Sequence, residues 1–314
     1  MSSEIVSIDQ HGLPLSDPEL LREIRRASKA PETWRAIVKN WKAFIIWCDG
    51  AGSSPLPCSP QAMESYLIHL VGKGMRTATI EQARYSIDAW HKWAGFVPPG
   101  DSELVKTTMA GIRRKLRARP DRKRALTIDH LRQVGFPKTL TGMRDKAILL
   151  IGFAGGFRRS ELAAIQVEHL EEIPSGLVVN LPRSKSDQEG KGESVSIVRS
   201  ASSPEWCPVQ ALHHWLEAAE IDSGAVFRSI SKGGKVGKQL SEKWVYLLVK
   251  QVAKTCGWDP SQFGGHSLRS GCATYLLERG VPLNIVSQHL RHKRVDTTLK
   301  YDRSATAKAL MGVY

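Results

Sequence analysis

The sequence lacks any apolar run approaching the roughly 20 residues that a transmembrane helix needs. Its first residues, MSSEIVSIDQHGLP, also lack the charged and then apolar layout of a secretory signal peptide. Both absences disfavour a membrane-spanning or secreted protein. We therefore expect a cytoplasmic protein that does not bind a membrane.

Cysteine is also scarce. The chain has five cysteines, and no two of them form a C-x-x-C pair: Cys48, Cys58, Cys207, Cys256 and Cys272. Such an odd, scattered set favours reduced thiols over a disulfide framework. Two histidine pairs, His213 with His214 and His289 with His292, lack cysteine or carboxylate partners at zinc-site spacing. The sequence therefore predicts no metal site.

Acidic residues are outnumbered by basic ones. The chain has 31 Asp and Glu against 45 Lys and Arg, which leaves a formal charge of +14. This excess indicates a polyanionic partner or an anionic membrane surface, and without a membrane signal nucleic acid is the better candidate. A length of 314 residues exceeds one compact core and favours two domains.

Four segments with helical apolar periodicity predict a helical first domain. They begin at Thr33, at Ser59, at Thr77 and after Ser102. Serine followed by proline, as at Ser59, is typical of a helix cap and first turn. The predicted organisation is an N-terminal extension at residues 1–30, a helical domain at 31–119, a basic linker at 120–125 and a second domain at 126–314.

The end of the fourth predicted helix and the linker are strongly basic. Residues 112–125 hold eight cations opposed only by Asp121: Arg113, Arg114, Lys115, Arg117, Arg119, Arg122, Lys123 and Arg124. A solvated helix end would explain a few cations near the negative pole of the helix dipole. Eight exceed what a dipole needs, so we expect contacts with a DNA backbone.

The second domain mixes helices with a few short strands. An apolar helix is predicted at residues 145–154, and another from Arg158 or Ser160 through Ile165. Segments 177–181 and 194–198 flank a polar stretch as strands flank a hairpin loop. Further helices are predicted at 208–219, 241–255, 267–279 and 282–289, with a last short helix at 303–314.

The last fifty residues place a tyrosine among cations. His266 and Arg269 come first, and Tyr301 follows nine residues after His292. A tyrosine phenol is a poor nucleophile at neutral pH unless cations assist it. The same cations would hold the non-bridging oxygens of a phosphate as charge builds in the transition state. The pattern indicates attack on a phosphodiester, and the alternative is a core tyrosine packed through its ring.

Five short motifs occur in order along the second domain: GGFRRSEL, RSKSDQ, GHSLRSG, HLRH and TTLKY. In this order they resemble the tyrosine recombinase (phage integrase) family of Cre-like site-specific DNA recombinases. The resemblance extends from the first helices to Tyr301. It implies a mainly α fold with a small antiparallel β-sheet. A four- or five-helix SAM-like core-binding domain and an α+β catalytic domain would form a C-shaped DNA clamp.

The resemblance assigns roles within the first two motifs. The family's catalytic Arg stands three residues before a Glu, which selects Arg158 over Arg159. Because residues three apart share a helix face, Glu161 would support Arg158 or the neighbouring histidine of the site. Arg159 would be a surface cation or a further phosphate contact. Lys185 would protonate the departing 5′ oxygen from the hairpin loop, with Lys191 as the alternative.

The remaining roles fall near the C-terminal end. His266 and Arg269 would open a helix whose free N–H groups favour a phosphate. By resemblance, His266 assists the tyrosine proton and Arg269 clamps the phosphate bidentately. His292 would donate to a non-bridging oxygen, and Tyr301 would be the nucleophile. The family usually has glycine before this histidine, whereas Arg291 stands there in this chain.

The implied reaction gives a 3′-phosphotyrosine and a free 5′-hydroxyl, followed by strand exchange through a Holliday junction. No metal, ATP or other cofactor is implied, because cations hold the phosphate and the covalent bond conserves its energy. The implied partners are double-stranded DNA with inverted-repeat sites and further copies of the chain, as a homotetramer on two duplexes. Residues 303–314 would dock on a neighbouring protomer. A bacterial, phage or mobile-element origin is implied.

Base recognition is less evident in the sequence. By resemblance, the third predicted helix and the helix at 241–255 would enter major grooves. Gln82 and Arg84 are expected to face outward on the first, and Gln239 and Lys243 to stand at the start of the second. Side chains of these types can reach base edges, and the alternative is solvated helix surface.

Two other functions stay open. A type IB topoisomerase uses a similar Arg, Lys, Arg, His and Tyr set and would relax supercoils without strand exchange. The GHSLRSG and RSKSDQ strings and the four-helix first domain favour a recombinase. A catalytically silent DNA-binding relative would have lost at least one catalytic residue, and none is missing.

Overall fold

The computed structural model describes residues 28–117, 123–182 and 192–302 of the chain. The chain divides into two compact units, with the boundary between residues 121 and 122. Each unit has its own hydrophobic core, and each is described by itself. Within the described residues, none of the helices combines the length and apolar character needed to cross a membrane.

The first unit is helical throughout its described residues. Its elements are α2 (Pro31–Gly50), α3 (Pro60–Gly72), α4 (Thr77–Trp93), the 3-10 turn η1 (Pro99–Asp101) and α5 (Glu103–Leu116). All four predicted helices are confirmed. The hydroxyl oxygens of Ser59 and Ser102 accept N–H groups in the first turns of α3 and α5, as expected of helix caps.

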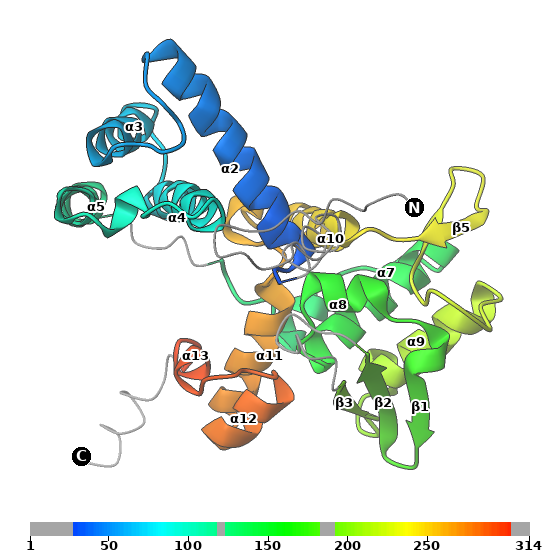
Figure 1. The fold of residues 1–314 in the computed structure, drawn as a ribbon. Helices are drawn as coiled ribbons and strands as arrows, with labels where there is room; N and C mark the ends of the chain where they lie inside the picture. The colour runs from blue at the N-terminus through cyan, green and yellow to red at the C-terminus, as the bar shows by residue number, and fades with distance from the viewer. Residues whose placement is uncertain (1–27, 118–122, 183–191, 303–314) are drawn as a thin grey trace, which may run out of the picture. The chain divides into compact units, whose positions relative to one another are not determined.

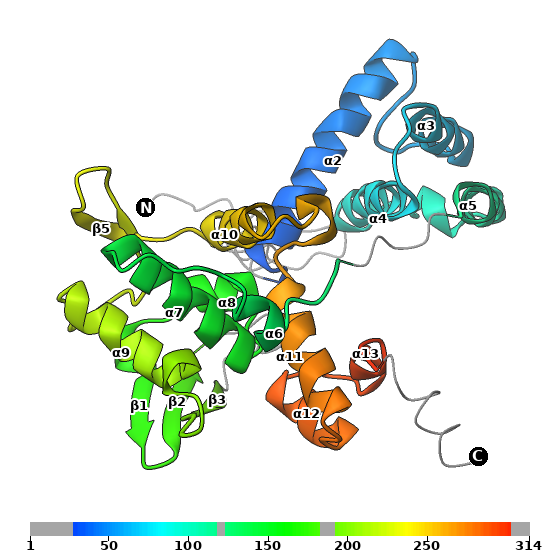
Figure 2. The same ribbon diagram turned by 180° about the vertical axis from the view of Figure 1, so that it is seen from behind.

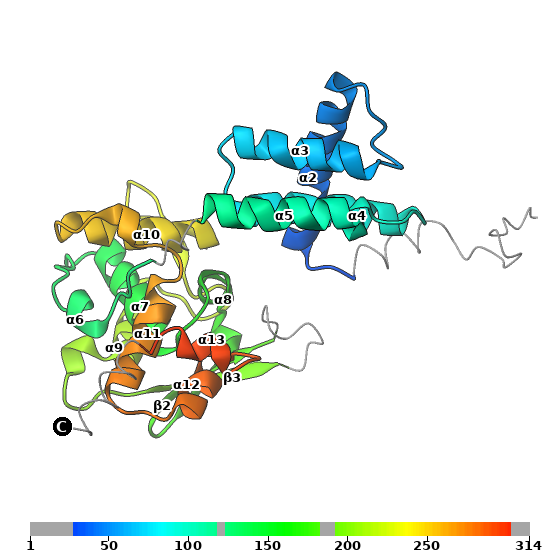
Figure 3. The same cartoon turned by 90° about the vertical axis from the view of Figure 1, so that its left-hand side faces the viewer.

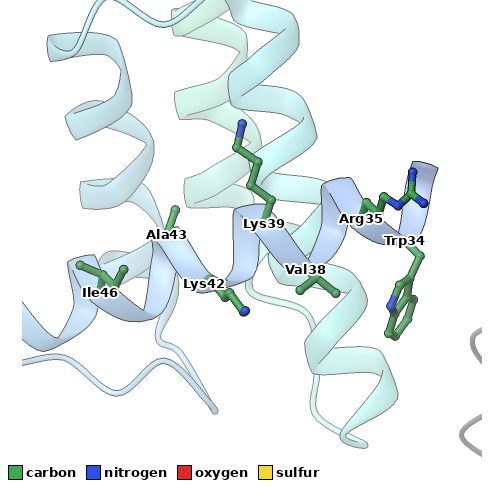
Figure 4. Close-up of a pocket in the computed structure, with 7 residues that line it drawn as sticks. All are labelled: Trp34, Arg35, Val38, Lys39, Lys42, Ala43 and Ile46. Carbon is green, nitrogen blue, oxygen red and sulfur yellow. The ribbon is translucent and has the colours of Figure 1, made fainter. Parts of the chain in front are cut away.

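The core of the first unit forms where α2 packs against α4 and α3 packs against α5 (Figure 3). Trp41, Phe44 and Tyr66 are buried there and contact one another through their rings. Another face of α2 lines a shallow hollow at the surface (Figure 4). Its side chains are both apolar and cationic: Trp34, Arg35, Val38, Lys39, Lys42, Ala43 and Ile46.

A buried carboxylate fixes the turn that leads into α5. Asp88 is buried on α4 and accepts a hydrogen bond of 2.9 Å from the amide of Gly100. Burial raises the pKa of Asp88, although the Gly100 amide and the Arg84 guanidinium oppose this rise. Arg84 pairs with Asp88 at 3.0 Å and also donates to the Gly100 carbonyl. The expectation that Arg84 faces outward is therefore corrected, because its guanidinium neutralises a buried acid.

The second unit contains most of the chain's regular structure. Its helices are α6 (Ile128–Leu131), α7 (Leu140–Ala154), α8 (Arg159–Ala164), α9 (Pro208–Ala218), α10 (Glu242–Thr255), α11 (Ser267–Glu278), α12 (Leu283–His289) and α13 (Asp296–Leu299). Its strands are β1 (Leu170–Ile173), β2 (Gly176–Leu181), β3 (Glu193–Val198), β4 (Arg228–Ile230) and β5 (Val236–Gln239). The predicted fold class, mainly helical with a small antiparallel sheet, is confirmed.

The antiparallel sheet has the order β1-β2-β3. Leu177 and Val179 of β2 and Val195 and Ile197 of β3 are buried, whereas alternate residues point outward, as the period of a strand requires. Helices α7 and α9 lie side by side, and β3 packs against both (Figure 2). The predicted hairpin of β2 and β3 is confirmed, and its polar loop at 183–191 falls outside the described residues.

Several elements were not predicted. Helix α7 begins at Leu140, five residues before the expected start, because Thr139 caps it and accepts from the amide of Gly142 at 3.2 Å. Strands β1, β4 and β5 are short and lie mostly at the surface, so they lack a clear apolar alternation. The four-residue helices α6 and α13 are too short for helical periodicity to show. The expected helix at 303–314 lies outside the described residues.

Candidate active site

The first part of the site is the entry to α8. Arg158 is its N-cap residue, and Glu161 on the first turn is buried. The backbone amide of Arg158 donates to one oxygen of Glu161 at 2.9 Å, and the Arg158 guanidinium donates to the other oxygen. A single carboxylate thus fixes both the backbone and the side chain of Arg158, as the sequence predicted for the pair.

Helix α11 presents the second arginine. Arg269 is 3% exposed, and its guanidinium donates to the carbonyl of Gly156 at 2.7 Å and to the carbonyl of Leu290. The Gly156 backbone has a φ of +54°, a left-handed conformation that glycine adopts without strain. Two backbone carbonyls, rather than a carboxylate, therefore hold Arg269 in place.

A third arginine, Arg291, shares the Glu161 carboxylate with Arg158. Arg291 has a φ of +56°, and its side chain is buried. Its guanidinium pairs with Glu161 at 2.8 Å and lies 3.6 Å from a carboxylate oxygen of Glu193 at the start of β3. The backbone carbonyl of Arg291 accepts from Arg158 at 3.5 Å. The side chain that replaces the family's usual glycine thus points into the site.

The candidate nucleophile, Tyr301, lies in the turn just after α13. The rings of His292 and Tyr301 are stacked, with their centroids 6.1 Å apart and their planes 10° from parallel. On the other side of the imidazole, Nδ1 of His292 lies 2.7 Å from the hydroxyl of Thr298, which is fully buried. Figure 1 shows α11, α12 and α13 following one another. His292 and Tyr301 both interact electrostatically with Arg269 of α11.

The site has a positive electrostatic potential. Burial first, and then the charges of Arg158 and Arg291, lower the pKa of Arg269 to about 10, although Glu161 and Tyr301 oppose the shift. Burial, followed by the same three arginines, lowers the pKa of His292 to about 4. The imidazole of His292 is therefore neutral at neutral pH. Among the described residues, Arg158 and Arg291 pair with Glu161, Arg291 also lies near Glu193, and backbone carbonyls hold Arg269.

The other predicted catalytic residues are placed as follows. His266 is exposed at the N-terminal end of α11, three residues before Arg269. Lys185 and Lys191 lie outside the described residues, but the loop that holds them starts and ends beside the paired residues Leu181 and Glu193. The Glu193 carboxylate contacts Arg291, so the base of this hairpin adjoins the site. Within the described ranges, no group of three His, Cys, Asp or Glu side chains could hold a metal ion.

The predicted DNA-contacting residues differ in their surroundings. Gln82 on α4 and Lys243 on α10 are exposed, whereas Gln239 ends β5 and donates to the carbonyl of Ala163 at 2.8 Å. In the basic stretch, five described residues are exposed: Arg113, Arg114, Lys115, Arg117 and Arg124. Lys123 is half-buried, and Arg119 and Arg122 lie outside the described residues. Arg113 pairs with Glu81, and Arg159 pairs with Glu242 at 3.4 Å.

A model of the phage integrase family matches residues 126–308, which is more than half of the chain. The chain belongs to the phage integrase family. The recombinase is 35% identical over 281 residues to an integrase/recombinase xerD homolog of Selenomonas ruminantium, and the match covers 87% of this chain and 82% of the relative. It is 22% identical over 303 residues to the recombinase cre of Escherichia phage P1, and the match covers 89% of this chain and 86% of the relative.

Solved structures agree with this family. The Tn1549 transposon integrase in complex with transposon right end DNA matches with a TM-score of 0.66 at 16% identity, over 94% of this chain and 98% of that chain. A lambda integrase dimer bound to a COC' core site matches with a TM-score of 0.59 at 14% identity, over 91% of this chain and 94% of that chain. At such identities the structures establish a shared fold. The predicted family and the enzyme class, a tyrosine recombinase, are confirmed.

Besides Arg291, three residues of the site were not predicted to belong to it. Thr298 stands six residues after His292 in the TTLKY motif, and its spacing could have indicated a contact across a short turn. Glu193 has no such signal, because only the pairing of β2 with β3 brings it to Arg291. The ring of Phe157 lies 5.3 Å from the Arg291 guanidinium, a contact that depends on the fold of both turns.

Proposed function

We propose that this recombinase cleaves and rejoins specific DNA sites with Tyr301 as the nucleophile. The observation that supports this proposal is the stacking of Tyr301 on His292 beside three arginines that are only partly neutralised. A DNA phosphodiester is an anion that this group of arginines would attract. Arg158 and Arg269 would bind its non-bridging oxygens bidentately.

The cleavage step forms a bond between the Tyr301 phenolic oxygen and phosphorus and breaks the bond between phosphorus and the 5′ oxygen. His266 would accept the phenolic proton, and Lys185 would donate a proton to the departing 5′ oxygen. The products are a 3′-phosphotyrosine and a free 5′-hydroxyl. Attack by the 5′-hydroxyl of a partner strand reverses the step and releases Tyr301.

The neutral state of His292 determines its role. With a pKa of about 4, the ring has one N–H at neutral pH. We assign the Thr298 hydroxyl as the donor to Nδ1, which leaves Nε2 as the N–H that faces the phosphate. A neutral donor adds no positive charge to a site that already contains three arginines, and it stabilises the developing charge through a hydrogen bond.

The proposed assembly has four copies of the chain on two duplexes with inverted-repeat sites, joined through a Holliday junction intermediate. The core-binding and catalytic domains would hold the duplex between them, and residues 303–314 would dock on a neighbouring copy. The basic residues of 112–125 would contact the DNA backbone. Exposed Gln82 and Lys243 are the better candidates for base contacts, because Arg84 and Gln239 bind protein groups.

The test is a covalent adduct between protein and DNA. Wild type, Tyr301→Phe and the control Tyr275→Phe are incubated with labelled duplexes that flank the gene, and adducts are separated in denaturing gels. Tyr275 packs against Phe153 in the core, so its variant should retain the adduct. We expect Tyr301→Phe to form none. An adduct that persists in Tyr301→Phe refutes the assigned nucleophile, and relaxation of supercoiled plasmid without recombination of two sites favours a topoisomerase.

A further inference from the structure

Arg291 has an unusual backbone conformation for its residue type. Its φ of +56° belongs to the left-handed region, which L side chains rarely adopt. Among the described residues, two other non-glycine residues have a positive φ, Arg117 and Glu220, and both are exposed. Arg291 is buried instead. Such strain persists where surrounding contacts compensate for it, and it is concentrated at functional sites.

The Arg291 guanidinium makes the contacts that compensate. One nitrogen donates to Glu161 at 2.8 Å, and another donates to the carbonyls of His289 at 3.0 Å and Gly155 at 3.3 Å. The planar group also lies over the ring of Phe157. Its Nε is buried without a hydrogen bond in the described structure and faces the Glu193 carboxylate at 3.6 Å.

Glu161 connects Arg291 with Arg158. One of its oxygens accepts from the Arg158 guanidinium, and the other accepts from the Arg158 amide and from Arg291. With Arg291 removed, a carboxylate that is 3% exposed would lose one of its two ion-pair partners. Losing one partner of a buried pair is costly, because the remaining charge keeps its desolvation penalty.

We propose that Arg291 is a positioning residue of the cleavage site, which holds Glu161 in place and through it fixes the Arg158 guanidinium for the phosphate. The proposal rests on the proposed function. It also explains why a position that usually has glycine in the family tolerates a strained arginine. The side chain joins the turn before His292 to α8 and to β3, whose first residue is Glu193.

The charges around Glu161 predict a pH dependence of the cleavage rate that a purely structural role of Arg291 would not produce. Burial tends to raise the pKa of Glu161, but Arg291 first and Arg158 next hold that pKa below its usual value. Arg269 also faces this carboxylate, and Glu193 and His289 lie near Arg291. Without Arg291, burial would dominate and the pKa of Glu161 would rise. Protonated Glu161 would then release Arg158 as the pH falls.

The experiment compares Arg291→Gly, Arg291→Lys and the control Glu220→Gly in the full-length chain. Glu220 has a φ of +51° and is exposed, so its glycine variant relieves the same kind of backbone strain without removing a buried charge. The probe is a duplex selected from a random-sequence pool by binding to the wild type. DNA affinity and the single-turnover rate of adduct formation are measured from pH 5.5 to 8.5, a range of about three units around neutrality.

We expect Arg291→Gly to slow adduct formation about tenfold or more at the acidic end, with the deficit shrinking as pH rises and DNA affinity nearly unchanged. Arg291→Lys keeps the charge but loses the planar fork, so its deficit should be smaller and independent of pH. Combining Glu161→Gln with Arg291→Gly should be no slower than the slower single variant. Glu220→Gly should match the wild type.

Two results would overturn the inference. One is an Arg291→Gly rate equal to that of wild type at every pH, and the other is additive effects of the Arg291 and Glu161 changes. Melting temperatures identify a folding defect in Arg291→Gly. In that case the pH profile of Arg291→Lys decides, because a deficit independent of pH agrees with the inference and a new acidic loss contradicts it. A wild type that forms no adduct refutes the proposed function itself, which separates the two failures.

Discussion

At the scale of single residues, the site depends on how buried charges are paired. Glu161 receives donors from Arg158 and Arg291, whereas Arg269 is held by the carbonyls of Gly156 and Leu290. Backbone carbonyls satisfy the Arg269 donors without cancelling its charge. Arg269 therefore keeps its positive charge, which the proposed function assigns to a phosphate, while the Glu161 carboxylate sets the geometry of its neighbours.

Thr298 gives the first prediction at this scale. Thr298→Val keeps the shape of the buried side chain but removes the hydroxyl that bonds Nδ1 of His292. The ring would lose the partner that sets its tautomer, so we expect the single-turnover cleavage rate to fall about tenfold while DNA affinity stays the same. Thr297→Val, on the half-buried neighbour, is the matched control. Equal rates for the two variants would contradict the assigned tautomer.

His292 also predicts how stability depends on pH. Its pKa is lowered to about 4 by burial and by three arginines, whereas an unfolded chain has the ordinary value of 6.5. Between these values the unfolded state binds a proton that the folded state does not. The free energy of unfolding should therefore fall as the pH drops from about 6.5 towards 4, and His292 should have no such effect above that range.

Urea unfolding of the free protein at a series of pH values checks this dependence. His292→Asn should have a shallower decline than the wild type over the acidic range. The decline should not vanish, because burial also lowers the pKa of His289, which the variant retains. An identical decline in both proteins would show that His292 titrates normally in the folded state.

At the scale of elements, the entry of α11 is fixed by a close approach of backbones. A Cβ on Gly271 would lie 1.9 Å from the carbonyl oxygen of Leu126, and the Leu126 amide donates to the carbonyl of Ser267 at 2.8 Å. Because Gly271 has no side chain, the segment at Leu126 can pair with α11, the helix that presents Arg269. Packing at this contact sets where the arginine lies.

Gly271→Ala tests this close approach. The added methyl meets backbone atoms that cannot move without shifting α11, so we expect a loss of about 1–3 kcal/mol in stability and a slower cleavage rate. Gly111→Ala on α5 is the control, because a Cβ there meets nothing within 4 Å. The control should gain roughly 0.5–1 kcal/mol from helix propensity. Stabilisation by both changes, measured in urea, would refute the packing argument.

At the scale of the whole molecule, the charge of +14 is unevenly placed. Among the described residues, exposed cations gather at the end of α5, at Arg113, Arg114, Lys115 and Arg117, whereas Arg269 and Arg291 of the catalytic site are buried and Arg158 is half-buried. These two groups have different consequences. We expect the exposed ones to make binding to DNA sensitive to salt through counterion release, whereas the proposed function assigns Arg158 and Arg269 to one phosphate.

The salt dependence of DNA binding tests the exposed group. Replacing Arg114 and Lys115 by glutamine should reduce the slope of log affinity against log salt by about 2 for a duplex of mixed sequence. Replacing Lys39 and Lys42 on the exposed face of α2 removes the same charge and should leave the slope almost unchanged (Figure 4). Equal losses in the two double variants would mean that net charge, rather than the basic stretch, controls binding.

Sequence periodicity predicted the long helices because each buries one face, as α2, α4 and α10 do. It failed for β1 and for the pair of β4 and β5, because these strands are short and none of their residues is fully buried, so no apolar alternation shows. The motifs likewise indicated that Arg158, Arg269 and Tyr301 belong to the candidate site. They did not indicate the hydrogen bonds that hold the side chains in place.

The sequence by itself determined the family, the mainly helical class and the order of the candidate catalytic residues, since motif spacing and apolar periodicity are local properties of the chain. Only the tertiary structure decided that Arg291 points into the site, that Arg84 pairs inward with Asp88, and that Glu193 meets the turn before His292. Each of these contacts joins segments from different elements. Their geometry depends on packing and burial, which no local pattern specifies.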